Sequence, residues 1–481
     1  MNAPGRPGSG VALGLACAAM LVALLASPVL PMTDLPQHAA QLALWERLGD
    51  LDWPGAERLR MNWATPYLGS YLPARALLVV LPAGAAMHLT VALGALAFPL
   101  ALRPLVRRLG GDPWWALLGV PAALGFPFAW GFLNFFLALP LVLLALERAL
   151  VWAEGGRPRD GGWLAFLTLA CLAGHFLAWG WTVAACAGLI HLRRGLDLHA
   201  RLLRSLPLLA GAPLAAAWVL RVSSLPGTPQ LPTLWESPLA RAARLPEGLF
   251  GAGPELVAGC LGLAGLALLA RPRRPLEPWR PWLLALAALT WAGPLRLGGA
   301  HHACERFAPL LLPGLLALLA PREAGPLRSA GCALLLMAAC ASPLVRLPAW
   351  SRLAADARDL RAVAAPIETG SEVFAFPAER RIAGLPGEVA ANLHAWIQVE
   401  RDVWVDYSFC STYPALVQLR RQEPWAHDPF VQSRDPRYRW MLVRCQQDPA
   451  AAFERFAPGW TRGWTLQDRR GSWWLYRRGD P

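Results

Sequence analysis

Long apolar runs recur along most of this chain and constrain its fold more than any other feature. They begin at Val11 and end at about Leu347. Of the 481 residues, 55% are hydrophobic and only 16% are charged. A soluble domain would not carry so many apolar runs, because it could not bury all of them away from water. The sequence therefore predicts an all-α, polytopic bundle in a membrane.

The runs give about eleven predicted spans. The first, Val11 to Leu30, is interpreted as an uncleaved signal anchor. The run from Leu68 to Ala83 is short and contains Pro73 and Arg75, so we interpret it as an interfacial or re-entrant segment. The other predicted spans lie at 86–102, 113–129, 131–150, 163–176, 177–192, 206–221, 255–270, 281–297, 307–320 and 329–347.

The arginines set the predicted orientation. The chain has no lysine, so all 45 basic residues are arginine. A cytoplasmic N-terminus places the arginine-rich loops, such as 103–108 and 271–280, on the cytoplasmic side, as the positive-inside rule requires. We therefore attribute the net charge of +13 to the cytoplasmic loops of a membrane protein, and no nucleic-acid partner is expected. An arginine-rich composition with abundant Ala, Gly, Pro and Leu indicates GC-rich coding, from which we infer a bacterial cytoplasmic (inner) membrane.

The composition changes near Pro348, which divides the chain into a predicted transmembrane domain (1–347) and a soluble C-terminal domain (348–481). An odd number of spans places the second domain, like the first long loop (31–85), outside the cytoplasm. The tail is expected to be a small α+β domain. Its predicted strands are 372–376, 403–407, 438–445 and 472–476, and its predicted helices are 356–364 and 450–456.

The nine cysteines do not predict a metal site, because none of them forms a CxxC pair. Most lie inside apolar runs. Cys410 and Cys445 lie in the polar tail and can form a disulfide if that tail is extracytoplasmic.

A carboxylate and an imidazole follow the first span directly, in the sequence Asp34-Leu35-Pro36-Gln37-His38. If a helix begins here, positions 34 and 38 share one face, and Pro36 fits its first turn. Ionisable groups at the membrane boundary indicate function. The alternative is that Asp34 only caps the helix.

Other polar residues fall on the same predicted outer side. Asn134 could bind a ligand or only hydrogen-bond another helix, and His175 could cap a turn. His302 belongs to a pair of adjacent histidines, which point apart on a helix and so make poor metal ligands. Glu305 and Arg306 lie at the mouth of a span, where the fork of an arginine suits a phosphate or simply pairs with the neighbouring glutamate.

These features together resemble the GT-C superfamily of polyprenyl-phosphate-dependent glycosyltransferases, which includes protein O-mannosyltransferases and lipid A aminoarabinose transferases. The matching features are the acidic motif at Asp34, the long first outer loop, the basic turn at 102–110, the stretch Gly-Phe-Leu-Asn-Phe-Phe at 131–136 and the soluble tail. The chain departs from the family pattern in having one carboxylate in the motif, where many members have an adjacent pair, and in lacking a clear second acidic position in a later loop.

The resemblance implies roles for these residues. Asp34 would be the general base on the acceptor, and His38 would orient Asp34 or bind the acceptor. Arg306, with His302, would hold the leaving phosphate of a polyprenyl-phosphate-linked sugar. The partners implied are this donor, membrane lipid and an acceptor of unknown identity. No cofactor is implied by the residues, and a divalent cation has no support among them.

Two other functions remain open from the sequence. A transporter or flippase of lipid-linked saccharides would use the same bundle, although no internal repeat is visible. A non-catalytic scaffold of the same fold would explain the single carboxylate.

Overall fold

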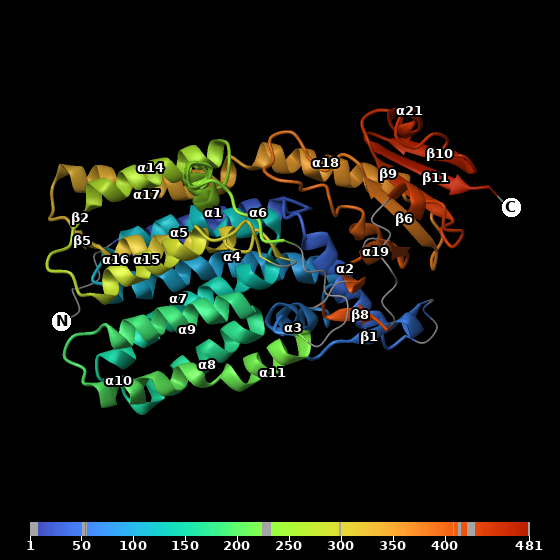
Figure 1. Cartoon of the computed structure of the whole chain (residues 1–481). Coiled ribbons are helices and arrows are strands. Elements are labelled where there is room, and N and C mark those ends of the chain that lie inside the picture. Colours follow the sequence, from blue (N-terminus) through green and yellow to red (C-terminus); the bar gives the residue numbers. More distant parts are fainter. Residues whose placement is uncertain are drawn as a thin grey trace.

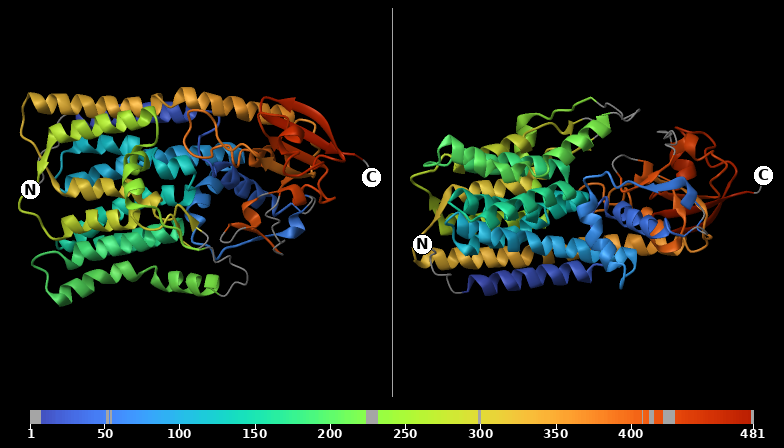
Figure 2. Two further views of the ribbon diagram at one scale, coloured as in Figure 1. Left: turned by 45° about the horizontal axis from the view of Figure 1, so that its top comes forward. Right: turned by 90° about the horizontal axis from the view of Figure 1, so that it is seen from below.

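The computed structural model describes residues 8–50, 53, 55–223, 232–297, 300–406, 408–411, 415–420 and 429–479. The molecule is elongated, with a helical bundle that carries a mixed helix-and-strand unit at one end (Figure 1). The N-terminus lies at the opposite end of the bundle from the C-terminus (Figure 2).

Helices that pack side by side form the bundle. Helix α4 packs against α7, which also contacts α8 and α9, while α1 and α14 pack against α17. Glycines allow the close approach of α14 and α17, since a Cβ on Gly265 would lie 2.9 Å from the Gly331 carbonyl. The long or apolar bundle helices are α1 (Ser9–Ala26), α4 (Ala83–Arg108), α7 (Leu133–Ala153), α8 (Pro158–Gly174), α9 (Phe176–His191), α14 (Pro254–Leu269), α15 (Trp279–Trp291) and α17 (Pro326–Leu344).

Fewer helices meet the requirements for a membrane span than the sequence predicts. Among the described residues, four helices are long and apolar enough: Ser9–Ala26, Ala83–Arg108, Leu133–Ala153 and Pro326–Val363. The count rises to five if the bent pair Leu198–Leu209 and Ala212–Val222 forms one span. The structure supports a multi-pass membrane protein, and the number eleven stays a prediction.

Several predicted spans are helical but broken. The region 113–129 divides into η2 (Pro113–Leu118), α5 (Gly119–Ala123) and α6 (Phe126–Trp130). Prolines and glycines interrupt the amide hydrogen bonds of such segments. The other short helical pieces of the bundle region are α10 (Leu198–Ser205), η3 (Leu206–Leu209), α11 (Ala212–Ser223), α12 (Pro238–Ala243), α13 (Leu245–Phe250), η4 (Glu305–Leu310) and α16 (Leu311–Ala317).

The predicted cytoplasmic loops lie together. Strands β2 (Ala270–Pro272) and β5 (Leu319–Pro321) pair at the N-terminal end of the bundle, where α10 also lies (Figure 1). A second small pair, β3 (Arg296–Leu297) with β4 (Ala300–His301), belongs to a different loop. The side of the membrane that these loops face stays a prediction.

The first outer loop forms α2 (Leu35–Arg47), η1 (Ala56–Arg58), β1 (Leu59–Met61) and α3 (Leu68–Leu77). Helix α3 has only 10 residues and contains Pro73, so it is too short to cross a membrane.

A five-stranded sheet forms the core of the C-terminal unit, with the order β10-β11-β9-β6-β7. Strand β6 is parallel to β7 and β9, and the other pairs are antiparallel. All four predicted strands are present, although Tyr407 lies outside the described residues. The sequence missed the polar edge strand β10. The elements are α18 (Leu347–Val363), β6 (Glu372–Pro377), α19 (Ala395–Arg401), β7 (Trp404–Val405), η5 (Phe409–Ser411), β8 (Val417–Leu419), α20 (Pro429–Gln432), β9 (Trp440–Arg444), α21 (Pro449–Phe453), β10 (Trp464–Arg470) and β11 (Trp473–Arg478).

The C-terminal unit is joined to the first outer loop. Strand β8 pairs with β1 in an antiparallel register that places Leu59 opposite Leu419. Ion pairs from Arg58 to Glu372 and from Arg47 to Asp402 connect the same two regions. The predicted boundary at residue 347 falls where α17 ends and α18 continues in nearly the same direction (Figure 2).

Cys410 and Cys445, which the sequence left open as a disulfide pair, are both free cysteines. Cys410 accepts a hydrogen bond from Gln41 Nε2 at 3.0 Å, so it faces α2. Cys445 lies by Glu379, with Sγ 3.8 Å from Oε1. Each sulfur therefore has a different structural neighbourhood.

Candidate active site

The segment before α2 is held by the turn between α6 and α7. The amide of Thr33 donates to the Ala129 carbonyl at 3.2 Å, and that of Asp34 donates to the Trp130 carbonyl at 3.3 Å. The carboxylate of Asp34 makes no capping hydrogen bond to α2. Instead it accepts one from Asn392 Nδ2 at 2.9 Å. The alternative in which Asp34 only caps the helix through its side chain is therefore wrong. The hydrogen-bond donor to Asp34 comes from the C-terminal unit.

Gly131 makes this close approach feasible. Its φ of 74° lies in the left-handed region, and a Cβ there would lie 2.5 Å from the Asp34 amide nitrogen. A side chain would therefore be strained by the backbone and would also collide with the loop.

Gly131→Ala is expected to lower the free energy of unfolding by about 1–3 kcal/mol and to displace Asp34. The matched control is Gly195→Ala, because Gly195 has a φ of 81° and open space around it. Thermal unfolding of both variants checks this prediction. Equal losses would show that only the backbone angle matters and that the contact with Asp34 does not.

Asp34 is half-buried, and its burial changes its acidity. Loss of water raises the pKa of Asp34 from 3.8 to about 7, against the opposing effects of the Arg306 guanidinium and the Asn392 amide. A carboxylate with a pKa near neutrality is ionised in part at pH 7 and can accept a proton from a substrate hydroxyl.

Arg306 is buried on η4 and is held by backbone carbonyls. Its Nε donates to the His302 carbonyl at 3.1 Å, and Nη2 donates to the His301 carbonyl at 3.0 Å. The guanidinium lies 4.1 Å from the centre of the Phe132 ring. Asp34 and Arg306 stabilise each other's charge, yet no ion pair joins them in the described part of the chain.

His175 belongs to the same group of residues. It separates α8 from α9, its Nδ1 accepts from the Leu177 amide at 3.1 Å, and its Nε2 lies 3.4 Å from Arg306 Nη1. The rings of Tyr67 and Phe135 pack on it, with centroids at 5.1 and 5.2 Å. The structure therefore brings Asp34, Arg306 and His175 together.

Asn134 is the second residue of α7. Its Oδ1 is buried without a hydrogen-bond partner among the described residues. A buried amide oxygen of this kind is satisfied by a water or by a ligand.

Glu305 and His302 form an ion-pair cluster next to Arg306. His302 pairs with Glu305, which also receives Arg241 Nη1 at 3.1 Å and Arg244 Nη2 at 3.2 Å. The His302 ring packs on Trp130 with centroids 4.1 Å apart. Glu305 is thus committed to two arginines and a histidine, and it does not pair with its neighbour Arg306 as the sequence alternative suggested.

Among the described residues, His38 makes no hydrogen bond to the Asp34 carboxylate. Nδ1 lies 2.6 Å from the hydroxyl of Tyr71, and the ring also hydrogen-bonds to the backbone of Gly131. Burial lowers the pKa of His38 to about 3, so the imidazole is neutral. These contacts connect α2 with α3 and with the Gly131 turn. The role of His38 in orienting Asp34 or binding the acceptor stays a prediction.

Asn392 and Tyr71 are the site residues that the sequence did not indicate. Asn392 is separated from Asp34 by 358 positions, and no local pattern marks it. Within the described residues there is no group of three or more His, Cys, Asp or Glu side chains that could hold a metal ion.

Among solved structures, this bundle with its C-terminal unit has a similar fold in at least one membrane enzyme. One solved structure with this fold is the arabinofuranosyltransferase AftD from Mycobacteria, with a TM-score of 0.52 at 15% identity, covering 98% of this chain and 40% of that one. This chain thus spans less than half the length of AftD. The comparison also returned ArnT from Cupriavidus metallidurans, with a TM-score of 0.47 at 14% identity, covering 98% of this chain and 99% of that one. No family model and no curated protein matches the sequence.

Proposed function

We propose that this protein is a membrane glycosyltransferase that moves a sugar from a polyprenyl-phosphate donor to an acceptor hydroxyl. The proposal rests on a half-buried carboxylate, Asp34, and a buried arginine, Arg306, that lie close enough for their charges to interact. No direct ion pair joins them among the described residues. The fold shared with an arabinofuranosyltransferase supports the same class of reaction.

Asp34 would act as the general base. It would take the proton of the acceptor hydroxyl as that oxygen forms its bond to the anomeric carbon of the sugar. The bond from the anomeric carbon to the phosphate oxygen breaks, and the electron pair leaves with the polyprenyl phosphate. The phosphate is a good leaving group, so the step needs no separate acid.

Arg306 would bind the leaving phosphate. A guanidinium has five N–H groups, and Arg306 uses three of them at most toward His301, His302 and His175 among the described residues. The remaining N–H groups are free to donate to phosphate oxygens, where negative charge grows in the transition state. The amide oxygen of Asn134, which has no partner among the described residues, would accept a hydrogen bond from a sugar hydroxyl.

This chemistry would take place on the extracytoplasmic side of a bacterial inner membrane, which is the side that the positive-inside rule predicts from the arginine distribution. The site lies at the end of the bundle that carries the C-terminal unit, away from the arginine-rich loops (Figure 1).

The test is transfer of radiolabelled sugar from a panel of polyprenyl-phosphate donors by the purified protein in proteoliposomes. We expect labelled acceptor together with free polyprenyl phosphate. Movement of intact donor between leaflets without any new glycosidic bond would contradict the proposal and establish a flippase.

Asn392→Ala gives a separate prediction about pH. The Asn392 amide lowers the pKa of Asp34, so its removal raises that pKa further above about 7. The acidic limb of kcat/KM is therefore expected to move to higher pH, with activity near neutrality reduced several-fold. A pH profile of both proteins measures this shift. An unchanged limb would mean that Asp34 does not titrate in the catalytic step.

A further inference from the structure

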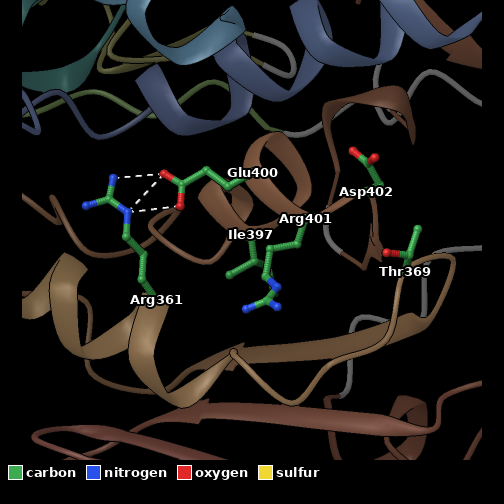
Figure 3. A pocket seen from close by; sticks show the side chains of 6 residues that line it. All are labelled: Arg361, Thr369, Ile397, Glu400, Arg401 and Asp402. Atoms are coloured by element: carbon green, nitrogen blue, oxygen red, sulfur yellow. Dashed lines mark hydrogen bonds and ion pairs between the residues drawn. The ribbon is translucent and has the colours of Figure 1, made fainter.

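A polar cleft lies on the C-terminal unit, apart from the candidate active site. It has a volume of about 410 Å³ and is lined by Arg361, Thr369, Ile397, Glu400, Arg401 and Asp402. Figure 3 shows these side chains around the last turn of α19, which carries Glu400 and Arg401. The size suits a small-molecule ligand, but Ile397 is the only apolar lining residue, so the cleft does not suit a lipid tail.

The charges in the cleft favour a ligand that is hydroxylated and anionic. Arg361 binds Glu400 through two of its nitrogens, with Nε 2.9 Å from Oε2 and Nη2 2.8 Å from Oε1. Asp402 is paired with Arg47 of α2. Arg401 makes no side-chain ion pair or hydrogen bond in the part of the chain that the structure describes, and Figure 3 shows it reaching from α19 between the other lining residues. Both carboxylates are thus neutralised, and one guanidinium is left for a ligand.

Helix α2 connects the cleft to the candidate active site. Asp34 precedes its first residue, and Arg47, its last, pairs with Asp402 at the cleft. The helix has 13 residues, which corresponds to a length of roughly 20 Å. Helix α19 packs along α2, so the two sites share one rigid support.

We propose that this cleft binds an internal segment of an acidic polysaccharide acceptor, with Arg401 paired to an anionic group on the glycan. This deepens the proposed function and rests on it. The carboxylates and Thr369 would accept or exchange hydrogen bonds with sugar hydroxyls, and Arg361 would donate to them. The separation along α2 means that several sugar residues lie between the cleft and the end that reaches Asp34. The acceptor is therefore a chain of sugars, not a monosaccharide.

The test is direct binding to full-length protein in nanodiscs, with an oligogalacturonate as the acidic probe and a malto-oligosaccharide of matched length as the neutral one. We expect the acidic probe to bind more tightly. Arg401→Ala should weaken its binding roughly ten-fold or more, because a charge-assisted hydrogen bond is lost, and Arg401→Lys should restore part of it. The control is Arg455→Ala, an exposed arginine of the same unit that does not line the cleft.

Three outcomes would overturn the inference. They are no preference for the acidic probe, equal binding by the Arg401 and Arg455 variants, and equally tight binding of a polyglutamate peptide. Asp34→Asn should bind the glycan as the wild type does. Glycan binding without any sugar transfer by the wild type would contradict the proposed function but not the cleft assignment. Sugar transfer without glycan binding would contradict the cleft assignment but not the proposed function.

Discussion

Asp34→Asn is expected to reduce sugar transfer at least about 1,000-fold while making the protein more stable at pH 8. The amide keeps the shape of the carboxylate and can still accept the hydrogen bond from Asn392. It cannot take a proton from the acceptor, so the loss falls on kcat.

The stability change follows from the raised pKa. The folded-state pKa of Asp34 is about 7 against an ordinary 3.8, so the folded protein holds this proton more tightly than the unfolded chain does. Stability of the wild type therefore falls as pH rises from about 4 to above 7, and the asparagine variant avoids that fall. The gain at pH 8 is at most about 4 kcal/mol and vanishes near pH 4.

Thermal unfolding followed by tryptophan fluorescence at pH 4 and pH 8 measures this difference. The matched control is Asp50→Asn, a change of the same kind in the same outer loop beyond α2. A variant that is less stable than the wild type at pH 8 would show that Asp34 is a structural anion, and would contradict its role as a base.

Arg306→Gln is expected to lower kcat by about 100- to 1,000-fold, since an oriented donor to the developing phosphate charge is removed. Arg306→Lys should recover only part of this, because an ammonium lacks the planar fork. The acidic limb of the pH profile should also move upward, as Arg306 lowers the pKa of Asp34.

Arg346→Gln is the matched control, because it shows how much of the loss of kcat comes only from removing a buried arginine that holds backbone carbonyls. Arg346 is also buried and also holds backbone carbonyls, those of Leu124 at 2.8 Å and Phe250 at 2.7 Å. Both variants should lower the melting temperature, because each leaves buried carbonyls unpaired. Only the Arg306 variant should move the acidic limb. If both variants lose kcat equally with no change in the pH profile, Arg306 is a structural residue and not a phosphate ligand.

The sequence was most informative where one local pattern decides the outcome. Apolar runs located the helices, and the non-spanning nature of α3 followed from the prolines and Arg75 in its run. Alternation located β6, β9 and β11 but not β10, whose Gln467, Arg469 and Arg470 are exposed at the edge of the sheet. The number of spans stays a prediction, because helices broken at proline and glycine form continuous apolar runs in the sequence.

The candidate site depends on contacts that no local pattern encodes. Asp34 and Arg306 were identifiable as ionisable groups next to apolar runs, whereas Asn392 is a lone amide in a soluble segment. The assignment of His38 depended on its spacing from Asp34, but the ring turns to Tyr71 because a buried neutral imidazole needs two hydrogen-bond partners. The disulfide interpretation rested on compartment alone, and the fold places the two cysteines in different surroundings.

The most direct test is sugar transfer from a panel of radiolabelled polyprenyl-phosphate sugars, with wild-type protein and Asp34→Asn measured side by side at pH 8. We expect labelled product with the wild type and a loss of at least about 1,000-fold with the variant, whose melting temperature should be the higher of the two. Equal transfer by both proteins would contradict the assignment of Asp34 as the base. No transfer by the wild type from any donor would contradict the enzyme and favour a scaffold.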